Sequence, residues 1–278
     1  PSPQLAPAPR RNRSLNLGLR EQSKLGSRTA TPVFMGLENG MSHLTETLVS
    51  SLAGSDIRTG IPAKSVEVDG DKLKVVTDGV SFDSEAVVVA TPAHQTARLL
   101  SSCQGAAERL SSIEHASVAL VTLGFRRQDV GNPLEGSGLL VPRSEGLLTT
   151  AVSWGSSKWP HWAGDEHVIL RVSAGRAGDT RALALDDNDL VEALLTEVAH
   201  ILKIEGNLVE WRVSRWIDAF PQYAPGHDRL VAAIERDLRS AMPGVFLAGA
   251  GYKGLGIPAC IHQGQQAANA ALDFLGTR

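Results

Sequence analysis

Cysteine, long apolar runs and an excess of one charge are all scarce in this 278-residue chain, and each scarcity excludes a class of protein. Two cysteines, Cys103 and Cys260, are too few for a disulfide scaffold and fit a reducing compartment, so we expect a cytoplasmic protein. The sequence has no apolar run long enough to predict a membrane-spanning helix. Lys and Arg number 27 against 30 Asp and Glu, which disfavours a basic nucleic-acid-binding protein. The content of 42% apolar and 21% charged residues is typical of a folded globular chain.

Residues 1–30 carry six basic side chains and one acidic residue, Glu21. This composition is typical of a solvated arm. A second interpretation is an anion-facing segment that meets carboxylates or makes a peripheral contact with a membrane surface. The chain starts at Pro1 rather than at a methionine, so we also expect it to be a piece of a longer protein.

Regular structure is expected from residue 31 onward. Ser42 is placed to cap a helix that ends before Gly54, with one apolar face formed by Leu44, Leu48, Val49 and Leu52. Two Asp-Gly pairs then separate β-rich runs, which predicts a β-meander with strands at 65–68, 73–77 and 85–90. The last run is apolar without alternation, and this predicts a strand that is buried on both faces.

The next part of the chain predicts helices around an antiparallel sheet. One helix is expected over 93–111, and the clearest amphipathic helix over 189–203. Short β-rich runs predict strands at 117–125, 138–141, 147–153, 167–173 and 208–214. The order of these elements predicts an α+β fold in which one domain is interrupted by another.

The segment with the clearest chemical signal is 244–258, a short apolar strand that runs into five glycines. Pro258 then opens an alanine-rich helix to about Leu275, because proline is favourable in a first helical turn. Glycines let a ligand approach the backbone, and a helix N-terminus offers free N–H groups and partial positive charge to an anion.

Gly249, Gly251 and Gly254 satisfy the dinucleotide-binding pattern G-x-G-x-x-G. We reject that interpretation because the pattern needs a later parallel strand with an acid at its end, whereas Asp273 still lies in the final helix. A glycine turn that serves only tight strand–helix packing is the simpler alternative.

Four segments in order resemble the porphyrinogen oxidases of haem synthesis, within the amine-oxidase-like FAD superfamily. The segment GVFLAGAGYKGLGIPACIHQGQQAANAA at 244–271 resembles their C-terminal flavin motif. The other three segments are 32–41, 83–93 with its VVVATPA, and 214–223 with its Arg-Trp and Pro-Gln-Tyr. Such enzymes begin with a strand–GxGxxG–helix unit that binds the FAD pyrophosphate, and nothing before Thr31 resembles it. We therefore expect a C-terminal portion whose partner is the missing FAD-binding unit.

The resemblance divides the chain into four parts and implies FAD as cofactor. These are the basic arm at 1–30, an α/β FAD-domain portion at 31–92, a substrate domain with an antiparallel sheet and helices at 93–210, and a second FAD-domain portion at 211–278. The cofactor-binding residues that it implies are Ala63, Trp216, Gly249, Leu255, Gly256 and Ile257. Of these, Trp216 could instead be an ordinary core tryptophan, and Ala63 a simple strand start.

The resemblance also implies an apolar slot with cations at its rim for a carboxylate-bearing porphyrinogen. Candidate substrate contacts are Thr91, Pro92, His94, Leu148, Thr150, Ser153 and Lys253. The eight histidines show no metal-ligand spacing, and no nucleophile triad is expected.

The implied reaction is oxidation of protoporphyrinogen or coproporphyrinogen to the porphyrin, with dioxygen as acceptor. It needs no side-chain nucleophile, since the flavin carries the chemistry. The alternatives are another flavin amine oxidase or desaturase, and a truncated remnant without catalytic function.

Overall fold

The structure is a computed structural model that describes residues 34–277, so the basic arm at 1–30 lies outside the described residues. The chain divides into two compact units after Ser51, and each is described by itself. In the first unit, helix α3 (Ser42–Ser51) begins at the residue expected to cap it. None of its residues is buried, and Leu48 and Val49 of its apolar face are about half exposed.

The second unit opens with a three-stranded antiparallel meander, β1 (Ala63–Asp69), β2 (Lys72–Thr77) and β3 (Ser81–Ser84). Both Asp-Gly turns connect these strands as expected, but the third strand of the meander is β3, so the prediction that the run at 85–90 is that strand was wrong. Its valines form β4 (Val87–Val89), which pairs in parallel with β10 (Val245–Leu247). The predicted burial on both faces was also wrong, because Val88 is 41% exposed.

The single helix expected over 93–111 was wrong, because the chain forms two helices there. Helices α4 (Ala93–Leu99) and α5 (Gln104–Ser111) are separated by a turn in which Cys103 N donates to Leu100 O at 2.9 Å. Leu100 and Cys103 are buried, so this turn lies in the core, and α5 packs against α8 (His227–Ala241).

The larger sheet has five antiparallel strands in the order β6-β7-β8-β5-β9. Their bounds are β5 His115–Arg126, β6 Gly138–Leu140, β7 Thr149–Trp154, β8 His167–Ala174 and β9 Glu210–Pro221. One face packs against α7 (Asp187–Leu202), which confirms the predicted amphipathic helix. Asp186 begins α7 by accepting a hydrogen bond from Asp189 N at 2.9 Å. Short helical turns complete the unit at η2 Arg127–Asp129, η3 Arg143–Glu145, α6 Gly155–Lys158, η4 Pro160–Trp162 and η5 Arg181–Leu183.

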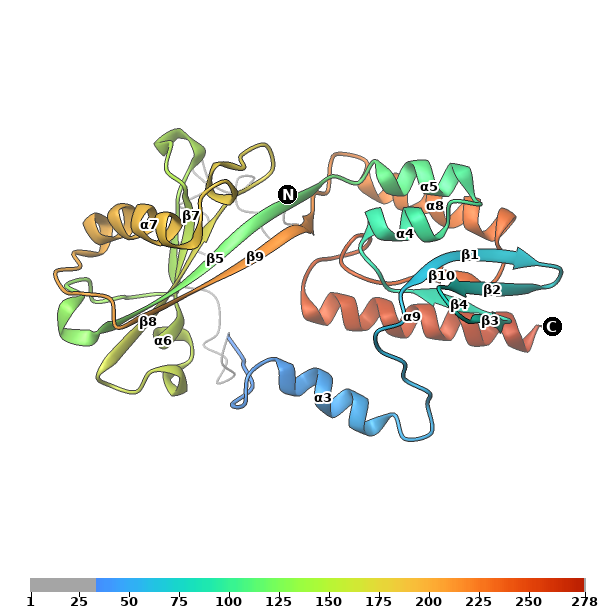
Figure 1. The fold of residues 1–278 in the computed structure, drawn as a ribbon, viewed down its shortest axis with the longest axis horizontal. Coiled ribbons are helices and arrows are strands. Elements are labelled where there is room, and N and C mark those ends of the chain that lie inside the picture. Colours follow the sequence, from blue (N-terminus) through green and yellow to red (C-terminus); the bar gives the residue numbers. More distant parts are fainter. Residues whose placement is uncertain (1–33, 278) are drawn as a thin grey trace, which may run out of the picture. The chain divides into compact units, whose positions relative to one another are not determined.

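Two separate hydrophobic cores stabilise this unit. The first lies between the five-stranded sheet and α7, and the second lies among the meander, α4, α5, α8 and β10. Strand β5 follows α5 directly and β9 leads into α8, so this strand pair connects the two cores (Figure 1). The predicted domain boundaries stay a prediction. From the residues that form each core, we propose that the domain boundaries lie near residues 114 and 222 rather than 92 and 210.

The last segment folds as expected, from β10 through the glycines into α9 (Ile257–Gly276). Pro258 lies in the first turn of α9, where its missing N–H costs no hydrogen bond. Within residues 34–277, no helix is long and apolar enough to cross a lipid bilayer.

Candidate functional site

The turn between β10 and α9 is a glycine turn in which different glycines serve different purposes. Gly249 and Gly254 have φ values of 128° and 133°, a region that side chains other than glycine rarely adopt. A Cβ on Gly254 would also lie 2.7 Å from the Cβ of Ala259. Gly256 has an ordinary φ of −77°, and a Cβ there would meet only the Pro258 ring, at 3.8 Å. The backbone therefore demands glycine at 249 and 254, whereas Gly256 leaves open space beside the helix.

Tyr223 holds this glycine turn in place. Its hydroxyl donates a hydrogen bond to Ala250 O at 2.6 Å and accepts one from Gly254 N at 2.9 Å. The ring stacks on His227, with centroids 3.9 Å apart, and burial raises the pKa of Tyr223 above its usual value. The sequence did not predict this role, although Tyr223 ends the Pro-Gln-Tyr stretch of the 214–223 segment.

Buried polar side chains support the turn from the protein side. The Gln263 amide, which is 5% exposed, accepts from Lys253 N and donates to Gly254 O. His227 Nε2 lies 3.0 Å from Tyr252 O, and the Tyr252 hydroxyl donates to Thr96 Oγ1 at 3.1 Å. These bonds fix the backbone of the turn before any ligand binds.

The tip of the turn combines the backbone N–H groups of the helix N-terminus with apolar side chains. Gly256 is the N-cap of α9 and provides no side-chain oxygen to the first N–H groups of the helix. Leu255 and Ile257, on either side of it, are 53% and 50% exposed. Because α9 has 20 residues, its N-terminus carries the partial positive charge of a full helix dipole. This arrangement suits a flat, partly apolar ligand that develops negative charge at a carbonyl or ring nitrogen.

The other two candidate cofactor residues lie on different elements. Trp216 is on β9, seven residues before Tyr223, and is 50% exposed, so it is not a core tryptophan. Ala63 is exposed and is the first residue of β1, as the simpler alternative expected. Their contacts with a cofactor stay predictions.

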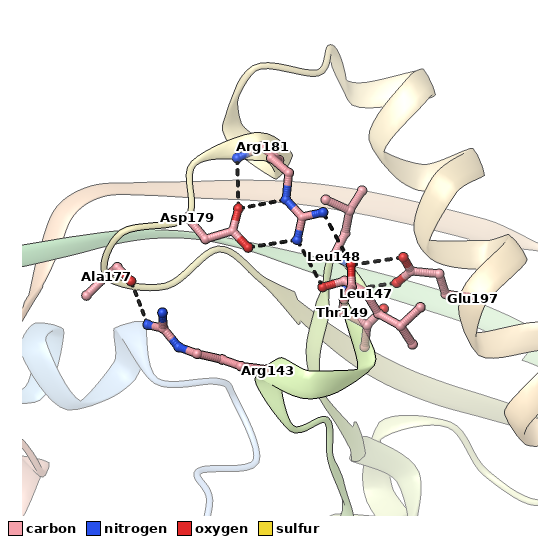
Figure 2. Close-up of polar contacts among 9 residues, drawn as sticks. Arg143, Leu147, Leu148, Thr149, Ala177, Asp179, Arg181 and Glu197 are labelled. Atoms are coloured by element: carbon pink, nitrogen blue, oxygen red, sulfur yellow. Dashed lines mark hydrogen bonds and ion pairs between the residues drawn. The ribbon is translucent and has the colours of Figure 1, made fainter.

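Two of the candidate substrate residues have structural partners on the substrate-domain sheet. The backbone N–H groups of Leu148 and Thr149 both donate to the Glu197 carboxylate of α7 at 2.9 Å (Figure 2). The Leu148 side chain packs against the first core, and Thr150 Oγ1 donates to Ser173 O at 3.0 Å. These contacts give Leu148 and Thr150 a structural role, and their role in substrate binding stays a prediction.

An arginine–carboxylate pair braces the loop beside this strand (Figure 2). Arg181 donates to both Asp179 oxygens and to Gly146 O, and this pairing lowers the pKa of Asp179 to about 2. With Arg143 and Arg176 it borders a cavity of about 430 Å³. The pair ties two loops of the sheet together, because Arg181 contacts the turn that precedes β7.

The remaining candidate substrate residues lie outside the five-stranded sheet: Lys253 belongs to the glycine turn, and Thr91, Pro92 and His94 lie at or next to the start of α4. The Thr91 hydroxyl lies 2.8 Å from Thr96 Oγ1, the group that receives the Tyr252 hydrogen bond, and Pro92 is exposed at the start of α4. Lys253 Nζ pairs with Glu235 at 2.5 Å and borders a cavity of about 660 Å³ between α8, β10 and α9. Lys253 is therefore engaged on α8, and its contact with substrate stays a prediction.

His94 forms an edge-to-face pair with His115, with ring centroids 4.8 Å apart. Burial, and then His115, lower the pKa of His94, and Asp218 partly opposes this shift. His94 Nδ1 and His115 Nε2 are buried without a hydrogen-bond partner in the part of the chain that the structure describes. A neutral His94 is thus favoured near pH 7. Among these described residues no group of three or more side chains could hold a metal ion.

Comparison with known proteins places this geometry in a family. The family model of the flavin containing amine oxidoreductases matches residues 13–272. The coproporphyrinogen III oxidase of Bacillus subtilis is 32% identical, over 98% of this chain and 59% of its own length. That of Mycobacterium leprae is 34% identical, over 87% of this chain and 52% of its own. The chain thus spans between half and three fifths of these relatives.

Solved structures agree with the sequence comparison. A protein from Exiguobacterium sp. 255-15, provisionally named a protoporphyrinogen oxidase, superposes with a TM-score of 0.83 and 27% identity, over 98% of this chain and 58% of its own. A cyclohexylamine oxidase from Brevibacterium oxydans shares the fold, with a TM-score of 0.66 at 16% identity. The mixed α/β architecture expected from the sequence is confirmed. This chain belongs to the flavin-containing amine oxidoreductase family.

Proposed function

We propose that this chain is the larger part of an FAD-dependent porphyrinogen oxidase. The observation that carries the proposal is the rigid glycine turn at the start of α9, where Tyr223 clasps the backbone and Gly256 leaves the helix N-terminus uncapped. Membership in a flavin-containing family and relatives named coproporphyrinogen III oxidase support it.

The residues of the turn fit the ring end of a flavin. Gly256 would allow close approach, the N–H groups of α9 would stabilise developing negative charge, and the side chains of Leu255 and Ile257 would offer apolar contact. A bound flavin would supply the two-electron acceptor that no protein side chain provides. Tyr223 and Gln263 would keep the turn fixed, so that binding requires little reorganisation.

We further propose coproporphyrinogen III as the substrate, dioxygen as the final acceptor and haem synthesis as the process. The names of the relatives favour this substrate over protoporphyrinogen. A separate FAD-binding stretch would complete the site. In support, β4 pairs only with β10 among the described strands, and Val88 remains 41% exposed.

Flavin titration tests the cofactor. Adding the full chain to FAD should quench flavin fluorescence, and Gly256→Val should weaken that effect about tenfold, which is a difference of about 1.4 kcal/mol. Equal titration curves for the two proteins would remove Gly256 from the cofactor site.

Porphyrin formation tests the reaction. Coproporphyrinogen III supplied in air to this chain, combined with FAD and the FAD-binding stretch that completes the site, should gain porphyrin fluorescence well above the rate of autoxidation in buffer. A rate equal to autoxidation would overturn the proposed activity.

A further inference from the structure

The face of the five-stranded sheet opposite α7 has a distinct chemical pattern. In β8, residues alternate between full burial under α7 and partial exposure, so that Leu170 and Val172 face the core and Arg171 faces the other side. In an antiparallel ladder, directly paired residues point to the same face. Arg171 is paired with Thr122 of β5 and with Ser153 of β7, so all three side chains share this open face.

Two basic side chains, Lys158 and Arg171, lie at this row of paired residues from β5, β8 and β7. Lys158 Nζ, from the short helix after β7, donates to Ser153 Oγ at 2.6 Å. The half-buried Arg171 makes no hydrogen bond or ion pair with any residue between 34 and 277. The next strand places Arg212 opposite Thr122, but Glu210 neutralises that guanidinium at 2.8 Å. Unlike Arg212, the Arg171 guanidinium therefore has no carboxylate partner among the described residues.

Apolar side chains follow on the same face, toward the glycine turn. Leu120 and Val118 lie two and four residues along β5 from Thr122, which is about 7 and about 14 Å at the rise of a β-strand. Trp216 of β9 is paired with Val118 and is half exposed. Beyond it, β9 continues to Pro221, and Tyr223 contacts the glycine turn. The order along this ribbon is therefore glycine turn, apolar platform, cationic row.

We propose that Arg171, Lys158, Ser153 and Thr122 form a carboxylate-binding row that anchors the propionate groups of the porphyrinogen. This inference rests on the proposed function. The apolar macrocycle would lie over Leu120, Val118 and Trp216, with its edge toward the glycine turn. A guanidinium binds a carboxylate through two parallel hydrogen bonds, and the neighbouring hydroxyls add donors, so the row fixes orientation as well as affinity. Arg171 is a substrate-binding residue in this arrangement.

The row favours a substrate with four propionates. A coproporphyrinogen carries a propionate on every pyrrole ring, so any in-plane rotation presents a carboxylate to Arg171. A protoporphyrinogen carries two, so only some orientations do. The row can thus discriminate substrates without any contact to the reacting carbon.

Binding of stable porphyrins to the full chain tests the row. The ligands are coproporphyrin III and its tetramethyl ester, which has the same ring without ionised carboxylates, followed by quenching of protein fluorescence. We expect the wild-type chain to bind the acid more tightly than the ester. Arg171→Gln should weaken binding of the acid roughly tenfold and leave binding of the ester within about twofold. Arg171→Lys should recover part of the loss.

Arg212→Gln is the matched control, because it removes a guanidinium from a neighbouring strand that Glu210 already neutralises. It should leave the affinity for both ligands within about twofold. Unchanged affinity of Arg171→Gln for the acid, or an equal loss for acid and ester, would overturn the row while leaving the proposed function intact. A wild-type chain that binds neither porphyrin would overturn both.

Discussion

At the residue scale, Gly254 and Gly256 have different roles: the fold requires glycine at 254, whereas glycine at 256 leaves space for a ligand. Gly254→Ala should lower the free energy of unfolding by about 1–3 kcal/mol, because φ is +133° and the new Cβ would lie 2.7 Å from the Cβ of Ala259. Gly256→Ala should change it by less than about 0.5 kcal/mol, because its φ is ordinary and the space beside it is open. Urea unfolding of the two variants measures this difference. Equal losses of stability would show that Gly256 is also required by the fold.

His94 predicts a loss of stability on acidification. Its pKa is lowered from 6.5 by burial, so below pH 6.5 the unfolded chain takes up this proton before the folded chain does. The free energy of unfolding contributed by this group is therefore complete above pH 6.5 and falls as the pH drops toward the lowered pKa. Urea unfolding from about pH 7.5 to about pH 5 should show a shallower decline for His94→Gln than for the wild type. Parallel declines would contradict this assignment.

At the scale of elements, the Glu197 carboxylate joins α7 to the start of β7 (Figure 2). Glu197→Ala should lower the free energy of unfolding by about 2–3 kcal/mol, because the N–H groups of the half-buried Leu148 and the buried Thr149 lose a charged acceptor. Thermal or urea unfolding measures the loss.

Glu192 on the same helix offers a matched control, since it is exposed and, among residues 34–277, its backbone carbonyl but not its carboxylate accepts a hydrogen bond, from Thr196. Glu192→Ala should change stability by less than about 0.5 kcal/mol. A similar effect of both substitutions would mean that helix propensity, rather than the contact with β7, accounts for the loss.

At the scale of the whole molecule, the second unit has two cores connected by the β5–β9 pair. Ile234 of α8 and Leu194 of α7 are fully buried, one in each core. Each substitution to alanine should lower stability by about 2–5 kcal/mol. Ile234→Ala should speed amide exchange in α4, α5 and α8 more than in β5 and β8, and Leu194→Ala should do the reverse. Uniform acceleration across both cores would show that they unfold as one.

Local patterns predicted the elements whose causes are local. The Asp-Gly pairs formed the two turns of the meander, the alternation in 167–173 formed a strand, and the periodic leucines formed α7. Helix α8 was missed, although Val231, Ile234 and Leu238 carry a helical spacing that could have predicted it. The break at Leu100–Cys103 was missed because the turn is stabilised by packing in the second core.

The sequence by itself determined the glycine turn, the start of α9 next to Pro258 and the family resemblance, because these depend on residues adjacent in the chain. Only the tertiary structure decided that β4 pairs with β10 across more than 150 residues, that Tyr223 clasps the turn, and that Arg171 shares a face with Val118 and Trp216. Strand pairing and side-chain contacts between distant segments depend on register and on competing partners. A strand's own residues show which positions alternate, but the neighbouring strand decides what they face.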